Sequence, residues 1–213
     1  MAVRVEYFQG ALKGSPFYGR PRPLVEMLAG SSIQQLQSVD LPAGWLVRCW
    51  GGWEGWAPPD WEPRLQGWKV HVSATPECAV ETLARVTRVC VEFGVSFKFL
   101  PTLAELTVSS SKNQARGAAG KFITIYPDDD GQLGELLSVL ASALRGQEGP
   151  YILSDLRYVP DAPVFVRYGA IVGVQTPDVD DEPVESIADP RSMRLIPDHR
   201  DPRVVIPDGV EVP

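Results

Sequence analysis

The chain has 213 residues, 44% of them hydrophobic and 22% charged, which is typical of a globular protein able to bury a core. Three cysteines and two histidines do not suggest a disulfide framework or a Cys/His zinc site. We therefore expect a metal-free protein of a reducing, cytoplasmic compartment. No apolar run approaches bilayer-spanning length, and the net charge of −7 argues against nonspecific nucleic-acid binding. We expect neither a membrane nor a nucleic-acid partner.

The first 59 residues predict an extension that packs on the following core. The sequence favours a short helix over residues 23–37, and the glycine- and tryptophan-rich run 50–56 is typical of a loop. All six tryptophans lie between Trp45 and Trp68, which favours a scaffold role over a peptide groove. We expect the core itself to cover residues 60–171.

Regular patterns begin at Trp68. Residues 68–73 alternate between apolar and polar, which is the period of a strand, and this places Lys69 and His71 together on the polar face. Thr75, followed by proline and glutamate, predicts the start of a helix. Apolar residues at helical spacing then continue to Gly94, which predicts its end.

Further strands and a second helix follow. Residues 95–100 place Lys98 on the face opposite two phenylalanines, and residues 121–126 form another strand after a polar loop. Leucines at helical spacing predict a helix over about residues 129–145. Shorter strands are expected at 151–153 and 164–168. The pattern predicts an α+β fold, a mostly antiparallel twisted sheet with amphipathic helices on one face and a cationic pocket on the other.

Acidic residues and prolines are concentrated near the C-terminus. Residues 172–213 contain ten Asp or Glu against four Arg, leaving 17 acids against 16 bases elsewhere, and they contain seven prolines. The strand and helix patterns disappear from about Val174. We therefore expect residues 172–213 to be an extended acidic tail, or a linker toward a further domain.

Cationic side chains recur on the predicted strands and on the loop between them. Like charges gather in this way where an anion binds, and phosphate or sulfate is the expected ligand. As alternatives, Lys69 and His71 could be solvated surface residues. The cations and the histidine concerned are Lys69, His71, Lys98, Lys112, Arg116, Lys121, Arg157 and Arg167.

Several phosphate chemistries are disfavoured by the sequence. A cysteine-dependent phosphatase needs an arginine six residues after its nucleophile, and none of the three cysteines has one. The carboxylates of residues 128–130 are better explained as a helix start than as metal ligands. P-loop and kinase motifs are absent from the sequence. These exclusions leave β-elimination of phosphate, or phosphate binding without chemistry.

Elimination from a phosphorylated residue needs a base for the Cα proton, cations for the developing enolate charge and an acid for the leaving phosphate. Lys98 is the best-placed base, because neighbouring cations and an apolar wall would lower the pKa of a lysine from about 10.4 toward neutrality. His71 is a suitable acid, because a histidine ordinarily titrates with a pKa of about 6.5.

The ordered motifs around these residues closely resemble the N-terminal lyase domain of class III and class IV lanthipeptide synthetases. That domain is similar to the phosphothreonine lyase effectors of bacterial pathogens. The resemblance is strongest over residues 60–171, and it implies a phosphothreonine-lyase-like fold and the conversion of phosphorylated Ser or Thr to dehydroalanine or dehydrobutyrine. The motifs are Trp68–Ser73, Phe97–Phe99, Gly120–Pro127, Pro150–Asp155 and Val166–Gly169.

The resemblance also implies roles for single residues. Lys98 matches the base, His71 the acid, and Lys69 the lysine that helps to stabilise the enolate-like intermediate. Arg116 precedes Tyr126 by ten residues, as an arginine precedes a tyrosine in the phosphate pocket of the effector lyases. The expected phosphate- or substrate-binding residues are Arg116, Tyr126, Arg167, Arg157, Lys121 and Lys112.

Two of these assignments have structural alternatives. Tyr126 could be a core residue whose hydroxyl is satisfied. The spacing of Arg157 to Arg167 departs from the effector pattern, and Arg157 could instead form a surface ion pair with Asp155 or Asp161. Residues 154 and 155 themselves are typical of a turn.

The resemblance further implies partners. In these bacterial synthetases a kinase domain phosphorylates the precursor peptide and a cyclase domain adds Cys thiols, so we expect both domains in the same full-length polypeptide, with a phosphorylated precursor peptide as substrate and no cofactor. Neither domain occurs in this chain, and a stand-alone lyase is an alternative. The competing function is a phosphopeptide- or leader-peptide-binding module without turnover.

Overall fold

The computed structural model describes residues 41–111, 114, 117–177, 183–198 and 204–213. The predicted helix over residues 23–37, and the predicted site residues Lys112 and Arg116, lie outside the described residues.

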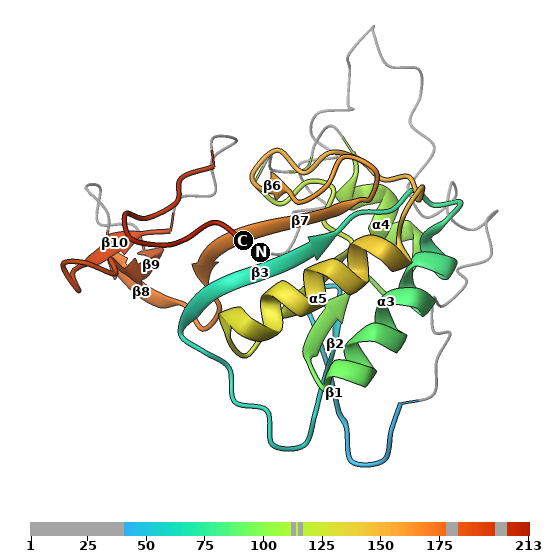
Figure 1. Cartoon of the computed structure of the whole chain (residues 1–213), viewed down its shortest axis with the longest axis horizontal. Coiled ribbons are helices and arrows are strands. Elements are labelled where there is room, and N and C mark those ends of the chain that lie inside the picture. The colour runs from blue at the N-terminus through green and yellow to red at the C-terminus, as the bar shows by residue number, and fades with distance from the viewer. Residues whose placement is uncertain (1–40, 112–113, 115–116, 178–182, 199–203) are drawn as a thin grey trace, which may run out of the picture.

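A seven-stranded sheet forms the centre of the fold, and every strand pair in it is antiparallel. Its strands occur in the order β1-β2-β4-β5-β3-β7-β6 (Figure 1). The predicted α+β class with a mostly antiparallel sheet is therefore confirmed. The strand bounds are β1 Leu46–Trp50, β2 Trp53–Ala57, β3 Gln66–Val72, β4 Ser96–Phe99, β5 Ile123–Tyr126, β6 Leu156–Arg157 and β7 Val164–Ala170.

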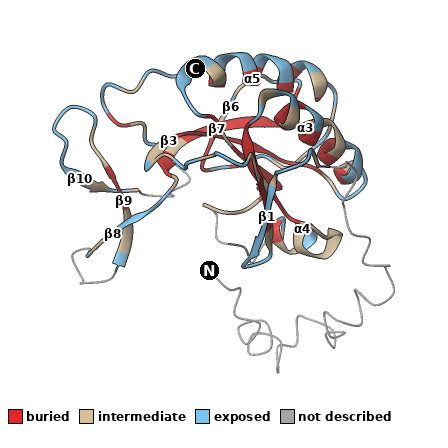
Figure 2. Ribbon diagram, turned by 90° about the horizontal axis from the view of Figure 1, so that it is seen from below, coloured by how far each residue is buried: buried red, intermediate tan, exposed pale blue. Residues whose placement is uncertain are grey.

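The predicted helices cover one face of this sheet. Helices α3 (Ala79–Phe93) and α5 (Asp130–Ala143) pack on one side, and the short helix α4 (Leu103–Ser109) lies on the other (Figure 2). Helix α3 ends at Gly94, whose φ of 62° is the left-handed conformation that glycine adopts readily. Asp129 caps α5 by accepting the backbone N–H of residue 132 at 2.7 Å.

Strand alternation sets which side chains enter the core. The helix-covered face of the sheet carries Trp68, Val70 and Val72 from β3, all at most 2% exposed. Phe97 and Phe99 of β4 lie on the same face and are buried to a similar degree. The lysine between the two phenylalanines and the polar residues of β3 consequently project from the opposite face.

The run 50–56 forms a hairpin, so its prediction as a loop was wrong. Strands β1 and β2 pair directly, and the glycines between them have φ of 53° and 82°. Positive φ at both turn residues is the geometry of a tight hairpin turn, and glycine supplies it without strain. The signal that suggested a loop was the turn between two strands.

The prediction of an extended segment after Val174 was also wrong for the described residues. Strands β8 (Val174–Pro177), β9 (Pro183–Ala188) and β10 (Leu195–Pro197) form a three-stranded antiparallel sheet beside the end of β7 (Figure 1). Three of the prolines stand at strand ends, where a missing N–H donor does little harm to the ladder. The division of the chain at residues 59 and 171 stays a prediction.

Candidate active site

The predicted base and acid lie in one row across the sheet. Lys98 on β4 is paired with Thr124 on β5, which is paired in turn with His71 on β3. Two strand spacings of about 4.8 Å separate the lysine backbone from the histidine backbone. Thr124 between them is 3% exposed. The face of the sheet opposite α3 and α5 therefore carries Lys98 and His71 on either side of Thr124.

A second row of polar residues lies beside the first. Lys69 on β3 is paired with Arg167 on β7, and Tyr126 on β5 is paired with Ser96 on β4. Lys69, Tyr126 and Ser96 are each two positions from a member of the first row, and Arg167 is the direct cross-strand partner of Lys69, so all project from the same face. Tyr126 is half-buried and its ring lies 6.0 Å from the ring of Trp61. The structure thus gathers Lys69, Arg167 and Tyr126 around the first row.

His71 is bound to a buried carboxylate. Its Nδ1 lies 2.5 Å from Oδ2 of Asp155, which is 1% exposed. The other oxygen of Asp155 lies 3.3 Å from Nζ of Lys121 and accepts the hydroxyl of Ser154 at 2.7 Å. The carboxylate fixes the ring so that Nδ1 carries the proton of the neutral imidazole and Nε2 carries none.

Asp155 is the ionised member of the Asp155–His71 pair, and His71 is the neutral one. Burial alone would raise the pKa of Asp155, but His71 and Lys121 outweigh burial and hold that pKa below its ordinary value. Burial lowers the pKa of His71 from 6.5 to about 3, Asp155 opposes this, and Lys121 and Lys69 add to it. With no phosphate present, His71 is therefore a neutral imidazole near pH 7.

A neutral, buried histidine makes stability depend on pH. Unfolding exposes His71, which then takes up a proton below pH 6.5, so the unfolded state binds the extra proton and stability falls as pH falls toward about 3. From pH 6.5 to 4.5, the free energy of unfolding should drop more steeply in the wild type than in His71→Gln, by up to about 1.4 kcal/mol per pH unit. Urea titrations at several pH values measure the difference, and parallel curves would contradict the prediction.

Lys69 and Arg167 are tied to one another through the end of β7. Nζ of Lys69 donates to the carbonyl of Ala170 at 2.6 Å, and the N–H of Ala170 donates to Asp198 at 3.0 Å. Nη2 of Arg167 donates to the same carboxylate at 2.5 Å. Lys69 is therefore held by the carbonyl of Ala170 and Arg167 by the carboxylate of Asp198. Asp198 comes from the C-terminal segment.

Lys98 is covered by aromatic rings of the β1–β2 hairpin. Its Nζ lies 4.7 Å from the ring centroid of Trp53 and 5.8 Å from that of Trp50. Such contacts attract an ammonium group. The ring of Trp50 also packs so closely over Gly55 that a Cβ there would lie 2.5 Å from it. The hairpin predicted as a loop therefore packs against Lys98.

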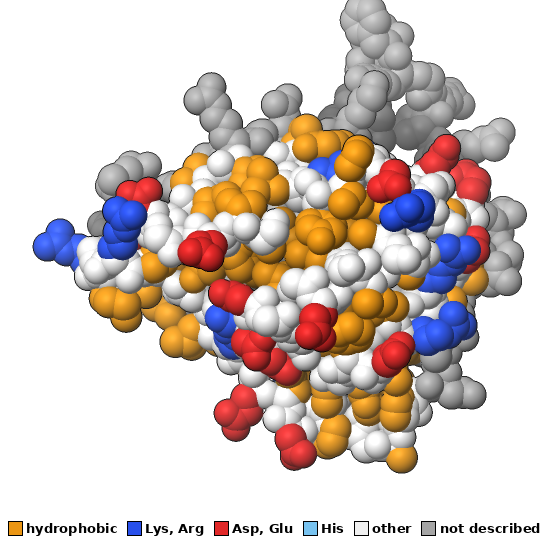
Figure 3. All heavy atoms as spheres, viewed as in Figure 1, with side chains coloured by type: hydrophobic (Ala, Val, Ile, Leu, Met, Phe, Trp, Pro, Cys, Tyr) orange, Lys and Arg blue, Asp and Glu red, His pale blue; other side chains and the backbone are white. Residues whose placement is uncertain are grey.

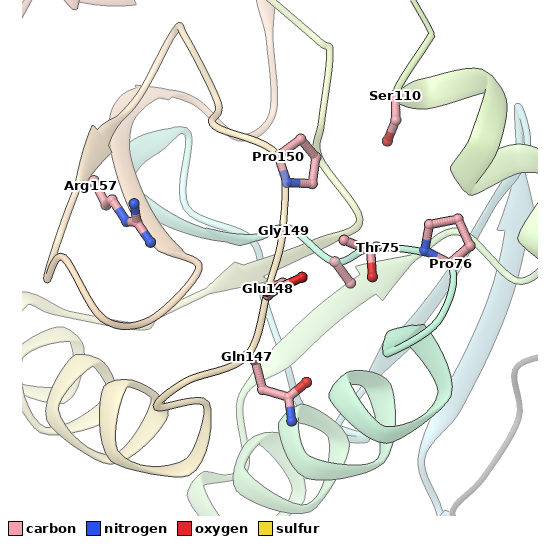
Figure 4. Close-up of a pocket in the computed structure, with 9 residues that line it drawn as sticks. Thr75, Pro76, Ser110, Gln147, Glu148, Gly149, Pro150 and Arg157 are labelled. Carbon is pink, nitrogen blue, oxygen red and sulfur yellow. The ribbon is translucent and has the colours of Figure 1, made fainter.

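Arg157 on β6 lies two strands beyond His71, since it is paired with Phe165, the cross-strand partner of His71. Its Nε donates to the carbonyl of Ala162 at 3.3 Å, its guanidinium lies 5.8 Å from the Phe165 ring, and no ion pair to Asp155 or Asp161 forms. It lines an open cavity of about 590 Å³, whose other walls include Thr75, Pro76, Ser110 and the segment 147–150 (Figure 4). Neither His71 nor Lys98 lines that cavity.

The opposite, helix-covered face has a different character. In the space-filling view its Lys and Arg side chains lie toward the margin and are interspersed with carboxylates around an apolar middle (Figure 3). Within the part of the chain that the structure describes, no cluster of His, Cys, Asp or Glu side chains could hold a metal ion. No described helix is long and apolar enough to cross a membrane.

Two carboxylates of the site were missed by sequence reasoning. The turn expected at residues 154 and 155 is present, since the N–H of Asp155 donates to the carbonyl of Ile152, but its carboxylate binds His71 and Lys121 rather than the local backbone. Asp198 was assigned to the tail. Neither has a spacing signal, because the site residue that each one binds, His71 for Asp155 and Arg167 for Asp198, is 84 or 31 residues away along the chain.

The family model described as "RamC, N-terminal domain" matches residues 34–213. A probable SapB synthase of Streptomyces coelicolor is 38% identical over 198 residues, which is 92% of this chain. The chain spans only 21% of the length of that relative.

Solved structures similar to this chain include phosphothreonine lyase effectors. One is OspF of Shigella flexneri, with a TM-score of 0.47 and 15% identity over 78% of this chain and 87% of that chain. Another is VirA of Chromobacterium violaceum, with a TM-score of 0.42 and 18% identity over 76% of this chain and 82% of that chain.

Proposed function

The chain belongs to the family of RamC N-terminal domains, and from that premise we propose that it eliminates phosphate from phosphoserine or phosphothreonine in a lanthipeptide precursor peptide. The products are dehydroalanine or dehydrobutyrine and inorganic phosphate. One observation carries the proposal: Lys98 and His71 stand in one row of the sheet with a single strand between them. A base and an acid at that spacing can address the Cα proton and the leaving oxygen of one residue.

The proposed reaction proceeds by proton transfer at both ends of the Cα–Cβ bond. The neutral amine of Lys98 takes the Cα proton, and Lys69 stabilises the negative charge that develops on the carbonyl oxygen. The electron pair of the broken Cα–H bond forms the Cα=Cβ double bond as the Cβ–O bond breaks. Nε2 of His71 donates a proton to the departing phosphate oxygen. No metal, redox partner or cofactor enters this balance.

The negative charge of the substrate phosphate can raise the pKa of His71 and so allow His71 to act as the acid. The residues of the chain alone keep the imidazole neutral, because burial and two ammonium groups lower the pKa of His71 to about 3. A phosphate ester brings nearly two negative charges at pH 7. Negative charge beside the ring favours the imidazolium, as Asp155 already does. We infer that phosphate binding raises the pKa of His71 and draws the catalytic proton into the site.

The phosphate pocket in this proposal consists of Arg167, Lys121 and Tyr126, with Arg116 and Lys112 contributed by the neighbouring loop. Arg157 is assigned to a more distant part of the peptide, because it lines the separate cavity of Figure 4. The relative is more than four times as long as this chain, which supports the proposal that kinase and cyclase domains of one polypeptide prepare the substrate and use the product.

A mass measurement tests the function directly. Incubation with a phosphoserine peptide, in the presence and absence of a chelator, should remove one phosphoric acid of about 98 Da and leave dehydroalanine. An added thiol should then react with the product. Replacement of phosphate by hydroxyl would indicate hydrolysis, and binding without any mass change would indicate a non-catalytic phosphopeptide module. Either result would overturn the proposal.

A further inference from the structure

We propose that Asp198 is a positioning residue that holds Arg167 in place to bind the substrate phosphate, an inference that rests on the proposed function. It assigns to the C-terminal segment a part in the active site. The contact joins two side chains that are 6% and 4% exposed, and Nη2 of Arg167 donates to Oδ1 of Asp198 at 2.5 Å.

Asp198 is itself fixed from three directions. One carboxylate oxygen accepts from Arg167 and the other accepts the N–H of Ala170 at 3.0 Å. Its own backbone N–H donates to the carbonyl of Glu185 on β9 at 2.7 Å. A carboxylate held in this way restricts the guanidinium to one position.

The charge arrangement of the second row explains why a carboxylate is needed there. Lys69 and Arg167 are direct cross-strand partners, and like charges in that position repel. Asp198 supplies a negative charge next to Arg167. The backbone of Ala170 links Lys69 to Asp198, because its carbonyl accepts from Lys69 and its N–H donates to Asp198. One carboxylate thus stabilises both cations in the positions proposed for phosphate and enolate.

The backbone of β7 has room for this contact only because residue 169 is glycine. A Cβ on Gly169 would lie 2.7 Å from Oδ2 and 2.8 Å from Oδ1 of Asp198. Gly169→Ala would therefore push the carboxylate away without removing any charge. It provides a second way to disturb the position of Arg167, independent of the substitution of Asp198 itself.

The experiment measures how tightly inorganic phosphate competes with a fluorescent phosphoserine peptide for the whole chain. Asp198→Asn and Gly169→Ala should each weaken phosphate binding by about tenfold, as expected for loss of one charge-assisted contact. Asp198→Glu keeps the charge and should restore part of the affinity. Asp208→Asn is the matched control, because Asp208 also pairs with an arginine, Arg191, but is 82% exposed. The control should bind phosphate like the wild type.

The possible outcomes separate this inference from the proposed function. Folded variants that bind phosphate as tightly as the wild type would overturn the inference, and Asp198 would then be a structural ion pair only. Tighter binding in Asp198→Asn would also overturn it, because the carboxylate would then occupy the phosphate site. If Asp198→Asn does not fold, Gly169→Ala and Asp198→Glu decide by the same measurement. Weakened binding in a chain that never eliminates phosphate would refute the lyase function and leave this inference standing.

Discussion

Lys98→Ala should lower the turnover number for phosphate elimination by about 10²–10⁴-fold and leave phosphopeptide affinity within about threefold of the wild type. The substitution removes the only amine in the first row, whereas the proposed phosphate ligands lie on β5, β7 and the loop before β5. Because the Cα proton is weakly acidic, no neighbouring group replaces the base. Single-turnover kinetics, followed by mass spectrometry, measure the rate, and anisotropy measures binding.

A matched control comes from the surface of the same domain. Arg145 is 71% exposed and pairs with Asp161, so Arg145→Ala removes a cation outside the site and should not affect the rate. Deuterium exchange gives a second readout for Lys98. Wild-type enzyme in D₂O should label Cα of unreacted phosphopeptide if proton removal is reversible, and Lys98→Ala should not. If Lys98→Ala eliminates phosphate at the wild-type rate, Lys98 is not the base.

The sequence was sufficient to predict the sheet class and the faces of the strands that carry Lys98 and His71, because strand alternation alone assigns a side chain to a face. Each of these residues lies within a strand whose period is clear over four or more positions. Antiparallel pairing then aligns β4, β5 and β3. Local patterns therefore indicated which face each side chain occupies, whereas the order that places β5 between β4 and β3 came from the structure.

The rest depended on contacts between segments that are distant in sequence. Asp155 reaches a histidine 84 residues away, and Asp198 reaches an arginine 31 residues away, so neither produces a periodic signal. The tail was misjudged because its prolines and acids resemble those of a linker. In the structure, prolines terminate short strands, and one of the acids is a buried counterion for Arg167. The composition of such a segment indicates its average exposure to solvent, and it does not reveal which single residues are buried.

Asp155→Asn should lower the turnover number by about 10²–10⁴-fold, because it impairs the acid and leaves the base intact. Asparagine can still accept the Nδ1 proton of His71, so the ring position changes little. The negative charge is lost, however, and Lys121 then remains beside the ring without the carboxylate that balances it. Both changes disfavour the imidazolium, so the pKa of His71 falls further and the leaving phosphate receives no proton.

The pH dependence distinguishes this defect from simple misfolding. A phosphate monoester has a second pKa near 6, so at lower pH it arrives with its own proton and needs less help to leave. The ratio of wild-type to Asp155→Asn rates should therefore shrink as pH falls from about 8 to about 6. Cα deuterium exchange should persist in this variant, because Lys98 is unaffected. Asp161→Asn, at an exposed carboxylate, should show neither effect.

A constant rate ratio across this pH range would contradict a role for Asp155 in supplying the acid. Loss of Cα exchange in Asp155→Asn would place the carboxylate on the side of the base. If instead exchange persists and the ratio shrinks toward acid, proton removal and phosphate departure are separable steps. Lys98 on β4 then acts in proton removal at Cα, and the Asp155–His71 pair, with His71 two strands away on β3, acts at the leaving oxygen.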